Sequence, residues 1–326
     1  MDNDYVSVFA FFTFYSYLLY SKMIKFKILK DIVINPTESK QTTSKPKQYI
    51  PPKEDILILE LMAELNKQRE EETPKIRNEE SSISWEYAAL IVETRKNNYL
   101  FDIIKHTLAC LPPKFGLYII GSSFNQDWLK EEAEAHSRSG LPIHRTQIWC
   151  LDKIRHFGIK GYNELMLSPK FWQMIKAQGT EKVLIFQPDG FPIRNGINPF
   201  INYDYIGAPW RNIPQNFDVE GIPKVNGVVG NGGLSLRSVS KMIQALDKYP
   251  ARGWLLKNYP EDVYYASVFP QMGFNVADKE TAMEFSHEVV YDKLNAFGSH
   301  CGWRYNPEIG RFIESQFRSR LKSEIK

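Results

Sequence analysis

The stretch Glu181–Gly190, EKVLIFQPDG, contains the pattern that decides the fold. Its apolar residues, Val183–Phe186, form a short continuous run with charged residues before it and Pro188, Asp189 and Gly190 after it. A run this short and this apolar is typical of a strand buried on both faces, as in a parallel sheet. Asp189 then follows the carboxyl end of a strand, where open α/β sheets bind their ligands. Pro-Asp-Gly is also ordinary turn chemistry, so this strand alone supports a turn and a site carboxylate equally.

Strands and helices alternate along the chain on both sides of this stretch. The other predicted strands are Ala88–Val92, Leu117–Ile120, Thr146–Leu151 and Leu234–Arg237. Helices are predicted over Leu100–Leu111, Asn125–His136, Lys170–Gln178, Ser238–Tyr249 and Pro260–Phe269. This alternation is typical of an α/β domain with a largely parallel sheet. We therefore predict one domain over residues 85–318, with Ala88–Val92, Leu117–Ile120 and Val183–Phe186 adjacent in one sheet.

The charge balance is nearly even, with 41 basic and 38 acidic side chains and a formal net charge of +3. Bulk electrostatic binding of nucleic acid requires a clear basic excess, so no nucleic-acid partner is predicted. The three cysteines, Cys110, Cys150 and Cys301, have no metal-site spacing and do not form an even set for disulfides. They favour a reducing compartment, in which thiols stay free.

Residues 1–30 combine an uncharged apolar and aromatic run, Tyr5–Tyr20, with a lysine-rich flank after it. The run is slightly shorter than the roughly 20 residues that cross a bilayer as a helix. Three interpretations stay open: a membrane anchor or membrane-surface segment, an appended buried helix or strand, and an incorrect translation start. As an anchor, the run would leave the following chain in the cytosol, because basic flanks favour that side.

Residues 31–84 form a predicted linker that is mostly irregular and packs little, because proline, charge and small polar residues dominate it. Within it, Ile56–Glu72 has the apolar spacing of a short amphipathic helix. Residues 319–326 are predicted to be a C-terminal tail.

Seven motifs follow one another in a recognisable order. They are WEYAALIVETR (85–95), LPPKFGLYIIGSSFN (111–125), KVLIFQPDG (182–190), YDYIGAPW (203–210), VVGNGGLSLRS (228–238), PEDVYY (260–265) and FGSHCGW (297–303). In this order they resemble an uncharacterised family of glycosyltransferase-like proteins, which is itself similar to the GT-A fold. The resemblance implies a GT-A-like single domain with a mostly parallel central sheet, preceded by an irregular N-terminal tail. It also implies sugar transfer from a nucleotide-diphosphate sugar to an acceptor hydroxyl.

The resemblance implies roles for individual residues, position by position. The end of the first strand, Val92, Glu93, Thr94 and Arg95, matches the segment that holds the nucleotide base and ribose. Gln187-Pro188-Asp189 falls at the place of an Asp-X-Asp metal motif, so Asp189 is a predicted donor and metal ligand.

Three further side chains receive predicted roles in the same way. His300 matches a late histidine that completes a metal site. Glu261 and Asp262 match an acidic pair near the acceptor, where a carboxylate acts as general base. Asp262 is the first candidate for the base and Glu261 the second, although acids in a first helical turn are also favoured by the helix dipole alone.

The glycines of the 228–238 motif are predicted to let the backbone approach a ligand, with Gly232 and Gly233 as donor-binding positions. The loop matches no Gly-X-Gly-X-X-Gly or Walker pattern, so a Rossmann or P-loop fold is rejected. Neutralisation of phosphate has several candidates among which the sequence does not choose. They are Arg95, Lys153, Arg155 and Arg237.

A divalent cation is the predicted cofactor, Mn²⁺ or Mg²⁺, since a hard cation stabilises a leaving diphosphate and imidazole suits Mn²⁺. Gln187 replaces the second acid of the metal motif, which weakens this prediction. Two function classes therefore stay open. The first is an inverting glycosyltransferase with a nucleotide-sugar donor and a glycan, protein or small-molecule acceptor. The second is a catalytically inactive protein that binds sugars or nucleotides on the same scaffold.

Overall fold

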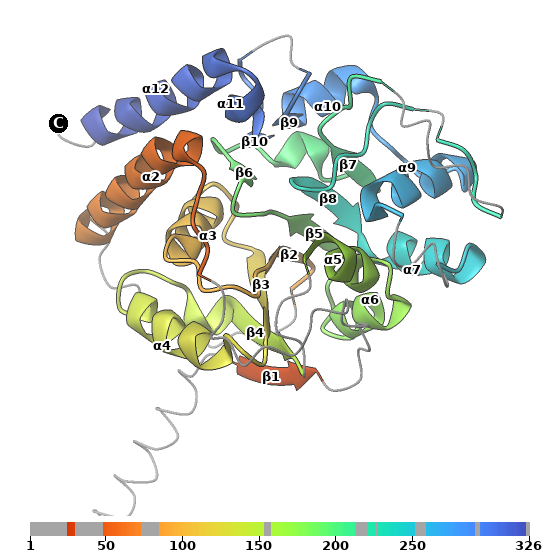
Figure 1. Ribbon diagram of the computed structural model, residues 1–326, viewed down its shortest axis with the longest axis horizontal. Helices are drawn as coiled ribbons and strands as arrows, with labels where there is room; N and C mark the ends of the chain where they lie inside the picture. Colours follow the sequence, from red (N-terminus) through yellow and green to blue (C-terminus); the bar gives the residue numbers. More distant parts are fainter. Residues whose placement is uncertain are drawn as a thin grey trace, which may run out of the picture.

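The computed structural model of the protein describes residues 25–29, 48–72, 85–152, 158–212, 221–225, 227–251, 259–290 and 294–323. Two sheets and the helices around them form the fold of these residues (Figure 1). The apolar run at residues 5–20, with its predicted membrane association, lies outside the described residues. Among the described helices, none has the length and apolar character needed to span a bilayer.

The larger sheet has seven strands in the order β1-β4-β3-β2-β5-β8-β7. Their bounds are β1 Lys25–Leu29, β2 Tyr87–Val92, β3 Phe115–Ser122, β4 Thr146–Leu151, β5 Lys182–Ile185, β7 Tyr205–Gly207 and β8 Ser235–Ser238. The strands β1, β4, β3, β2 and β5 pair with one another in parallel, whereas β8 is antiparallel to both β5 and β7. The predicted α/β class with a mostly parallel sheet is confirmed, and the three strands expected to be adjacent are β3, β2 and β5.

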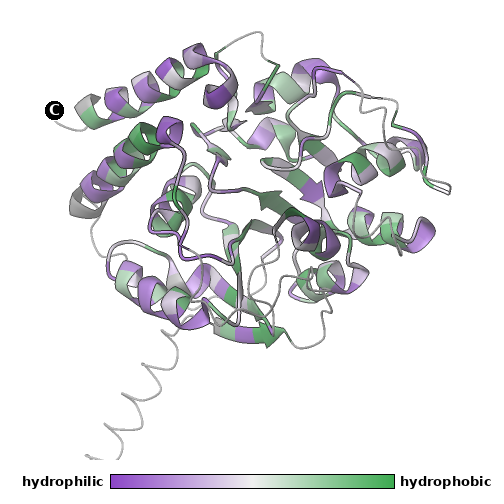
Figure 2. Cartoon of the chain, viewed as in Figure 1, coloured by the Kyte–Doolittle hydropathy of each residue, from purple (hydrophilic) through white to green (hydrophobic). Residues whose placement is uncertain are grey.

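Apolar side chains cover both faces of this sheet. Along β2, Ala89 and Ile91 belong to one buried apolar cluster, and Ala88 and Leu90 belong to the other. Successive side chains of a strand point to opposite faces, so a strand buried on both sides is apolar throughout. The central strands are accordingly mainly green in Figure 2, whereas purple is common on the surrounding helices.

Helices pack against each face of the sheet. One layer contains α2 Lys53–Glu72, α3 Leu100–Ala109, α4 Gln126–Ser137 and α12 Pro307–Ser323, with the short helices α10 Lys279–Phe285 and α11 Gly302–Tyr305 at its end. The opposite layer contains α5 Gly158–Met166, α6 Pro169–Lys176, α7 Val239–Lys248 and α9 Glu261–Gln271. Single 3₁₀ turns occur at Ile143–Arg145 and Asn198–Phe200.

Helix α6 illustrates how the local sequence determines where a helix begins and which of its faces is buried. The Ser168 side-chain oxygen accepts a hydrogen bond from the Phe171 N–H at 3.3 Å, and Pro169 occupies the first turn, where its missing N–H leaves no bond unmade. Phe171, Trp172 and Ile175 form its buried face. The cap and the apolar spacing therefore both agree with the predicted helix over Lys170–Gln178.

Helix α2 corrects the prediction that residues 31–84 pack little, because the described part of this range packs on the domain. Its buried face consists of Asp55, Ile58, Leu59, Leu61, Met62, Leu65 and Asn66. The Asn66 Nδ2 donates to the Asp102 carbonyl of α3 at 2.9 Å, and the Gln68 Nε2 donates to the Leu321 carbonyl of α12 at 3.4 Å. The apolar spacing within the segment outweighs the proline and charge around it, so the predicted helix forms and packs on the domain. The folded core therefore includes residues before position 85, and α12 continues past the predicted end at position 318.

A second, three-stranded sheet has the order β6-β10-β9. Its strands are β6 Gly190–Pro192, β9 Ser286–His287 and β10 Gly298–His300, and none of them was predicted from the sequence. The strand β10 is antiparallel to β6 and parallel to β9. This small sheet pairs β10, which carries His300, with β6, which directly follows the turn after β5.

Candidate active site

Two predicted site segments meet at the middle of the larger sheet. The chain runs outward from β2 through β3 and β4 and then returns to the other side of β2 as β5. Ligands of open α/β sheets bind at the carboxyl ends of the strands where the order reverses in this way. Val92 ends β2 and Glu93–Arg95 follow it, while Gln187–Asp189 follow β5, so both segments lie at this position.

Asp189 lies in a tight turn between β5 and β6. Gln187 and Gly190 exchange backbone hydrogen bonds across this turn at 2.8 and 2.9 Å. Proline suits the second position of such a turn because its φ is fixed. Pro188 and Gly190 therefore act as turn residues, while the Asp189 side chain stays 24% exposed. The turn and the presentation of a carboxylate, which the sequence left as alternatives, occur together.

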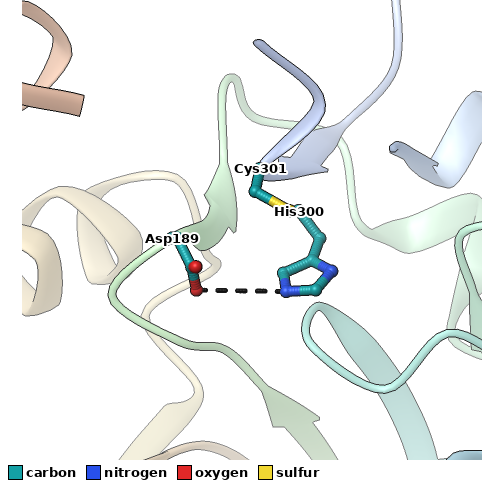
Figure 3. Close-up of side chains that lie close together, drawn as sticks. All are labelled: Asp189, His300 and Cys301. Carbon is teal, nitrogen blue, oxygen red and sulfur yellow. Dashed lines mark ion pairs between the residues drawn. The ribbon is translucent and has the colours of Figure 1, made fainter. Parts of the chain in front are cut away.

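His300 faces Asp189 because the small sheet pairs their strands. His300 is the register partner of Gly190, and the next backbone N–H, that of Cys301, donates to the Asp189 carbonyl at 2.6 Å. The His300 Nε2 lies 3.9 Å from the Asp189 Oδ1 (Figure 3). The structure thus brings the two predicted metal ligands together, and their metal-binding role stays a prediction.

A buried carboxylate orients the His300 ring from its other side. The His300 Nδ1 is 3.2 Å from the Glu288 Oε1, and this oxygen also accepts a bond from the Asn231 Nδ2 at 2.9 Å. Burial acts to lower the pKa of His300, but the Glu288 bond and the charges of Asp189, Glu288 and Asp262 outweigh it, so the pKa is raised. In the neutral ring, a proton on Nδ1 for the Glu288 bond makes Nε2, the nitrogen that faces Asp189, the acceptor.

Cys301 is the third potential ligand at this position. One ligand atom each from Asp189, His300 and Cys301 lie within 4.8 Å of one another. Cys301 has a left-handed backbone with a φ of 44°, a conformation that non-glycine residues adopt rarely and often at functional sites. Burial, together with the charges of Asp189 and Glu288, raises the pKa of Cys301 to about 12, so its thiol holds its proton at neutral pH.

Arg304 neutralises Asp189 from the side opposite His300. Its Nη1 donates to the Asp189 Oδ2 at 2.8 Å, and its Nε donates to the Asp55 Oδ1 of α2 at 2.9 Å. The Asp189 Oδ1 is the oxygen that faces His300. One carboxylate therefore presents one oxygen to a guanidinium and the other to an imidazole.

The glycine-rich loop lies between His300 and Asp262. The Gly232 N–H donates to the Asp262 Oδ2 at 3.2 Å. A Cβ at Gly232 would lie 2.4 Å from the Glu261 Oε1, and a Cβ at Gly233 would lie 2.2 Å from the His300 Nε2. A Cβ at either position would clash with a side chain of the protein itself, so glycine is required here. Contact of these glycines with a nucleotide-sugar donor stays a prediction. The loop is the element that brings Asp262 and His300 to one place.

Asp262 and Glu261 are neighbours with different surroundings. Asp262 is partly exposed, and burial together with the charge of Glu261 raises its pKa to about 7. Glu261 is buried, and its two oxygens accept from the Arg237 Nη1 and Nη2 at 2.5 and 2.9 Å. Burial acts against the charge of Arg237, but the Glu261 carboxylate outweighs it and raises the Arg237 pKa. A carboxylate held on both oxygens by one guanidinium is poorly placed to accept a proton, so the geometry favours Asp262 as a base.

The end of β2 is held by an internal ion pair. The Glu93 carboxylate accepts from the Arg95 Nε at 2.8 Å and from the Arg95 Nη2 at 2.7 Å, and both Glu93 and Thr94 are buried. The Arg95 guanidinium lies 4.4 Å from the centre of the Tyr49 ring, and the charge of Asp189 acts on both Arg95 and Tyr49. Glu93 and Thr94 thus shape this edge, while Arg95 remains partly exposed toward Asp189.

The basic residues predicted as candidates for neutralising phosphate differ in their exposure. Arg237 is fully buried against Glu261, which removes it from the set of side chains that could reach a phosphate. Lys153 and Arg155 lie outside the described residues. Arg95 and Arg304 are partly exposed, and the charge of Asp189 acts on both.

Sequence reasoning missed four side chains of this site. They are Asp55, Asn231, Glu288 and Arg304. Arg304 follows the motif of His300 by one residue, and an arginine that close to a predicted metal ligand was a usable signal. Glu288 and Asp55 carried no such signal, because one stands in an irregular connection and the other in a segment predicted to be a linker.

Comparisons with known proteins give a family model over part of the chain and several solved structures of low similarity. A family model described as "Protein of unknown function (DUF5672)" matches residues 145–300, which include Asp189, Asp262 and His300. No curated protein matches the chain.

Several solved structures are similar. Mouse xyloside xylosyltransferase 1, in its apo form, has 11% identity and a TM-score of 0.39, covering 67% of this chain and 97% of the other. The apo-form glycosyltransferase GlyE of Streptococcus pneumoniae has 12% identity and a TM-score of 0.38, covering 73% of this chain and 64% of the other. The mannosyltransferase PcManGT of Pyrobaculum calidifontis, in complex with GDP-Man and Mn²⁺, has 11% identity and a TM-score of 0.35, covering 69% of this chain and 66% of the other. The chain thus spans less than two thirds of the last two.

Proposed function

We propose that this protein is a glycosyltransferase that moves a sugar from a nucleotide-diphosphate sugar to an acceptor hydroxyl with inversion. The observation that carries the proposal is the grouping of Asp189, His300 and Asp262 around one glycine loop at the strand-order reversal of an α/β sheet. The motif order supports it, because the quoted motifs resemble a glycosyltransferase-like family.

Asp262 is the proposed general base. Its carboxylate is partly exposed, and a pKa of about 7 places its ionisation near neutral pH, where a base is most effective. In the proposed step the acceptor oxygen attacks the anomeric carbon as the bond from that carbon to the diphosphate oxygen breaks. The acceptor proton moves to Asp262, and the electron pair of the broken bond stays on the nucleotide diphosphate. The products are a glycoside and a nucleoside diphosphate.

The arginines are proposed to bind the negative charge of the donor. Arg304 and Arg95 are 27% and 31% exposed at their side chains and lie near Asp189. A guanidinium carries five N–H donors, so the N–H groups that do not bond Glu93, Asp55 or Asp189 can donate to phosphate oxygens. Glu93 and Asp55 hold these two side chains in place, which limits the entropy lost on binding.

The residues present fit a divalent cation of the Mn²⁺ type. Asp189 offers a carboxylate oxygen and His300 offers a ring nitrogen whose partner atom is bonded to Glu288, the arrangement typical of metal-binding histidines. Imidazole suits Mn²⁺ better than Mg²⁺, and the protonated Cys301 thiol is a poor ligand for either. When bound, such a cation would neutralise charge on the leaving diphosphate.

Three variants test the proposal together. We expect Asp189→Ala and His300→Ala to weaken binding of Mn²⁺ and of the nucleotide sugar, measured by titration calorimetry. We expect Asp262→Asn to bind the donor like the parent protein and to transfer sugar roughly 10²-fold more slowly or worse, since it nearly keeps the shape and removes the base. Transfer by Asp262→Asn at the parent rate would exclude Asp262 as the base.

A second candidate function is binding of a sugar nucleotide without catalysis. Gln187 stands where a second acid is expected, and Arg304 already neutralises one oxygen of Asp189. This arrangement favours a phosphate-binding site that does without metal. Nucleotide-sugar turnover measured with and without acceptors separates the two candidates, because only the enzyme releases nucleoside diphosphate.

A further inference from the structure

Helix α2 reaches into the candidate site from a part of the chain that was predicted to be a linker. Its first-turn residue Asp55 is 2% exposed. Its Oδ1 accepts from the Trp303 Nε1 at 2.8 Å and from the Arg304 Nε at 2.9 Å, and its Oδ2 accepts from the Arg304 Nη2. Asp55 therefore holds the guanidinium of Arg304 along one whole edge.

The same guanidinium holds Asp189 with its remaining nitrogen. The Arg304 Nη1 donates to the Asp189 Oδ2 at 2.8 Å, and the Asp189 Oδ1 is turned toward the His300 Nε2 at 3.9 Å. A planar guanidinium cannot rotate one N–H without moving the others. Its attachment to Asp55 therefore fixes the direction from which it meets Asp189, and with it the oxygen that Asp189 presents to His300.

The chain just before α2 is bound to the same edge of the sheet. The Tyr49 N–H donates to the Lys96 carbonyl at 2.6 Å, and the Tyr49 ring lies under the Arg95 guanidinium. Residues 48–55 therefore contact both the loop after β2 and the residue that follows His300 by four positions. Two independent attachments place this segment within the site rather than beside it.

We propose that Asp55 is a positioning residue of the cation site, acting on Asp189 through Arg304. This inference rests on the proposed function, because it concerns the cation site assigned there to Asp189 and His300. Asp55 has two effects on that site. It offsets the charge of Arg304, which otherwise repels a cation, and it keeps Arg304 from turning to occupy both oxygens of Asp189. Partners of metal-binding side chains typically change metal affinity by about 10- to 100-fold when they are removed.

A double-mutant cycle in the full chain tests this role, with Mn²⁺ alone as the probe and titration calorimetry as the measurement. We expect Asp55→Asn to raise the Kd for Mn²⁺ by about 10- to 100-fold. In the Arg304→Gln background, addition of Asp55→Asn is expected to leave the Kd unchanged, because the residue through which Asp55 acts is gone. Ile58→Ala is the matched control, since it removes a buried α2 side chain (3% exposed) without touching Arg304. It should lower the melting temperature and keep the parent Kd.

The outcomes separate the alternatives. An unchanged Kd in folded Asp55→Asn, or an equal loss in Ile58→Ala, would overturn the positioning role while leaving the proposed function intact. If Asp55→Asn alone does not fold, the comparison of Arg304→Gln with the double variant still decides, because unequal values of Kd contradict action through Arg304. Failure of the parent protein to bind Mn²⁺ would overturn the metal-assisted part of the proposed function and this inference with it.

Discussion

At the scale of single residues, the pair Glu261 and Asp262 shows how adjacent carboxylates acquire different chemistry. The sequence offers the two as a pair in a first helical turn and ranks them only by resemblance. The structure places one against a buried arginine and leaves the other partly exposed beside a backbone N–H. The difference depends on Arg237, whose position opposite Glu261 follows from the register of β8 and could not be derived from the local sequence.

The raised pKa of Asp262 leads to a specific pH dependence of activity. The base must be ionised, so kcat/KM should rise with pH and level off above a pKa of about 7. The ionisation of Asp262 is influenced by the charges of Glu261 and Arg237, and the charge of Asp262 acts in turn on Tyr162. A pH profile of kcat/KM for the parent protein and Asp262→Asn checks this prediction. If kcat/KM of Asp262→Asn still rises with pH in the same way, the ionisation belongs to another group.

The two carboxylates should also differ in stability. Glu261→Gln leaves Arg237 charged and unpaired in the interior, so we expect a loss of about 3–5 kcal/mol in the free energy of unfolding. Glu181→Gln removes one partner of an exposed ion pair with Lys176 and should change stability by about 0–1 kcal/mol. Urea unfolding of both variants at neutral pH measures the difference. Equal effects would mean that the buried pair contributes no more than a surface pair.

The ionisation of Asp262 also makes the stability of the protein depend on pH, and this stability falls as pH rises, whereas activity increases. Its pKa is raised in the folded protein, so its contribution to stability is fully present below its ordinary pKa and is lost as pH rises through about 7. Asp262→Asn removes this loss, and the variant should gain stability relative to the parent protein across that pH range.

At the scale of secondary-structure elements, helix α2 is the main departure from the sequence prediction. Five apolar residues at helical spacing predict the helix, but the surrounding proline and charge predict a linker, and the local sequence does not indicate which elements the helix packs against. Its partners are α3 and α12, and α12 follows all the strands of both sheets in the sequence. The side-by-side position of α2 and α12 is visible in Figure 1.

Two leucines on α2 provide a matched test of its packing. Leu65 is fully buried, whereas Leu57 is 43% exposed. Leu65→Ala should lower the free energy of unfolding by about 2–5 kcal/mol, since it removes buried methyl groups and leaves a cavity. Leu57→Ala should stay within about 0.5 kcal/mol of the parent protein. Both variants replace leucine by alanine in one helix, so their helix propensities change equally. Similar losses in chemical denaturation would show that α2 does not pack as described.

At the scale of the whole molecule, the central sheet was predictable and the site was predictable in part. Continuous apolar runs identified β2, β3, β4 and β5 because each is buried on both faces and is coded within a few residues. The strands β6, β9 and β10 have two or three residues each and carry no periodic pattern. They form only because other segments pair with them. The sequence therefore predicted Asp189 and His300 as site residues. It did not predict Glu288, which bonds His300, or Arg304, which bonds Asp189.

The ion pair between Asp55 and Arg304 joins positions that are 249 residues apart in the chain. During synthesis, at roughly 5–20 residues per second, Asp55 leaves the ribosome on the order of ten to fifty seconds before Arg304 follows. Throughout that interval the apolar face of α2 lacks α12 as a cover, and the nascent protein is exposed to aggregation and to chaperones. Helices α11 and α12, which are synthesised after α2, therefore complete both the core and the site, so a translation product that stops before them would lack the complete form of either.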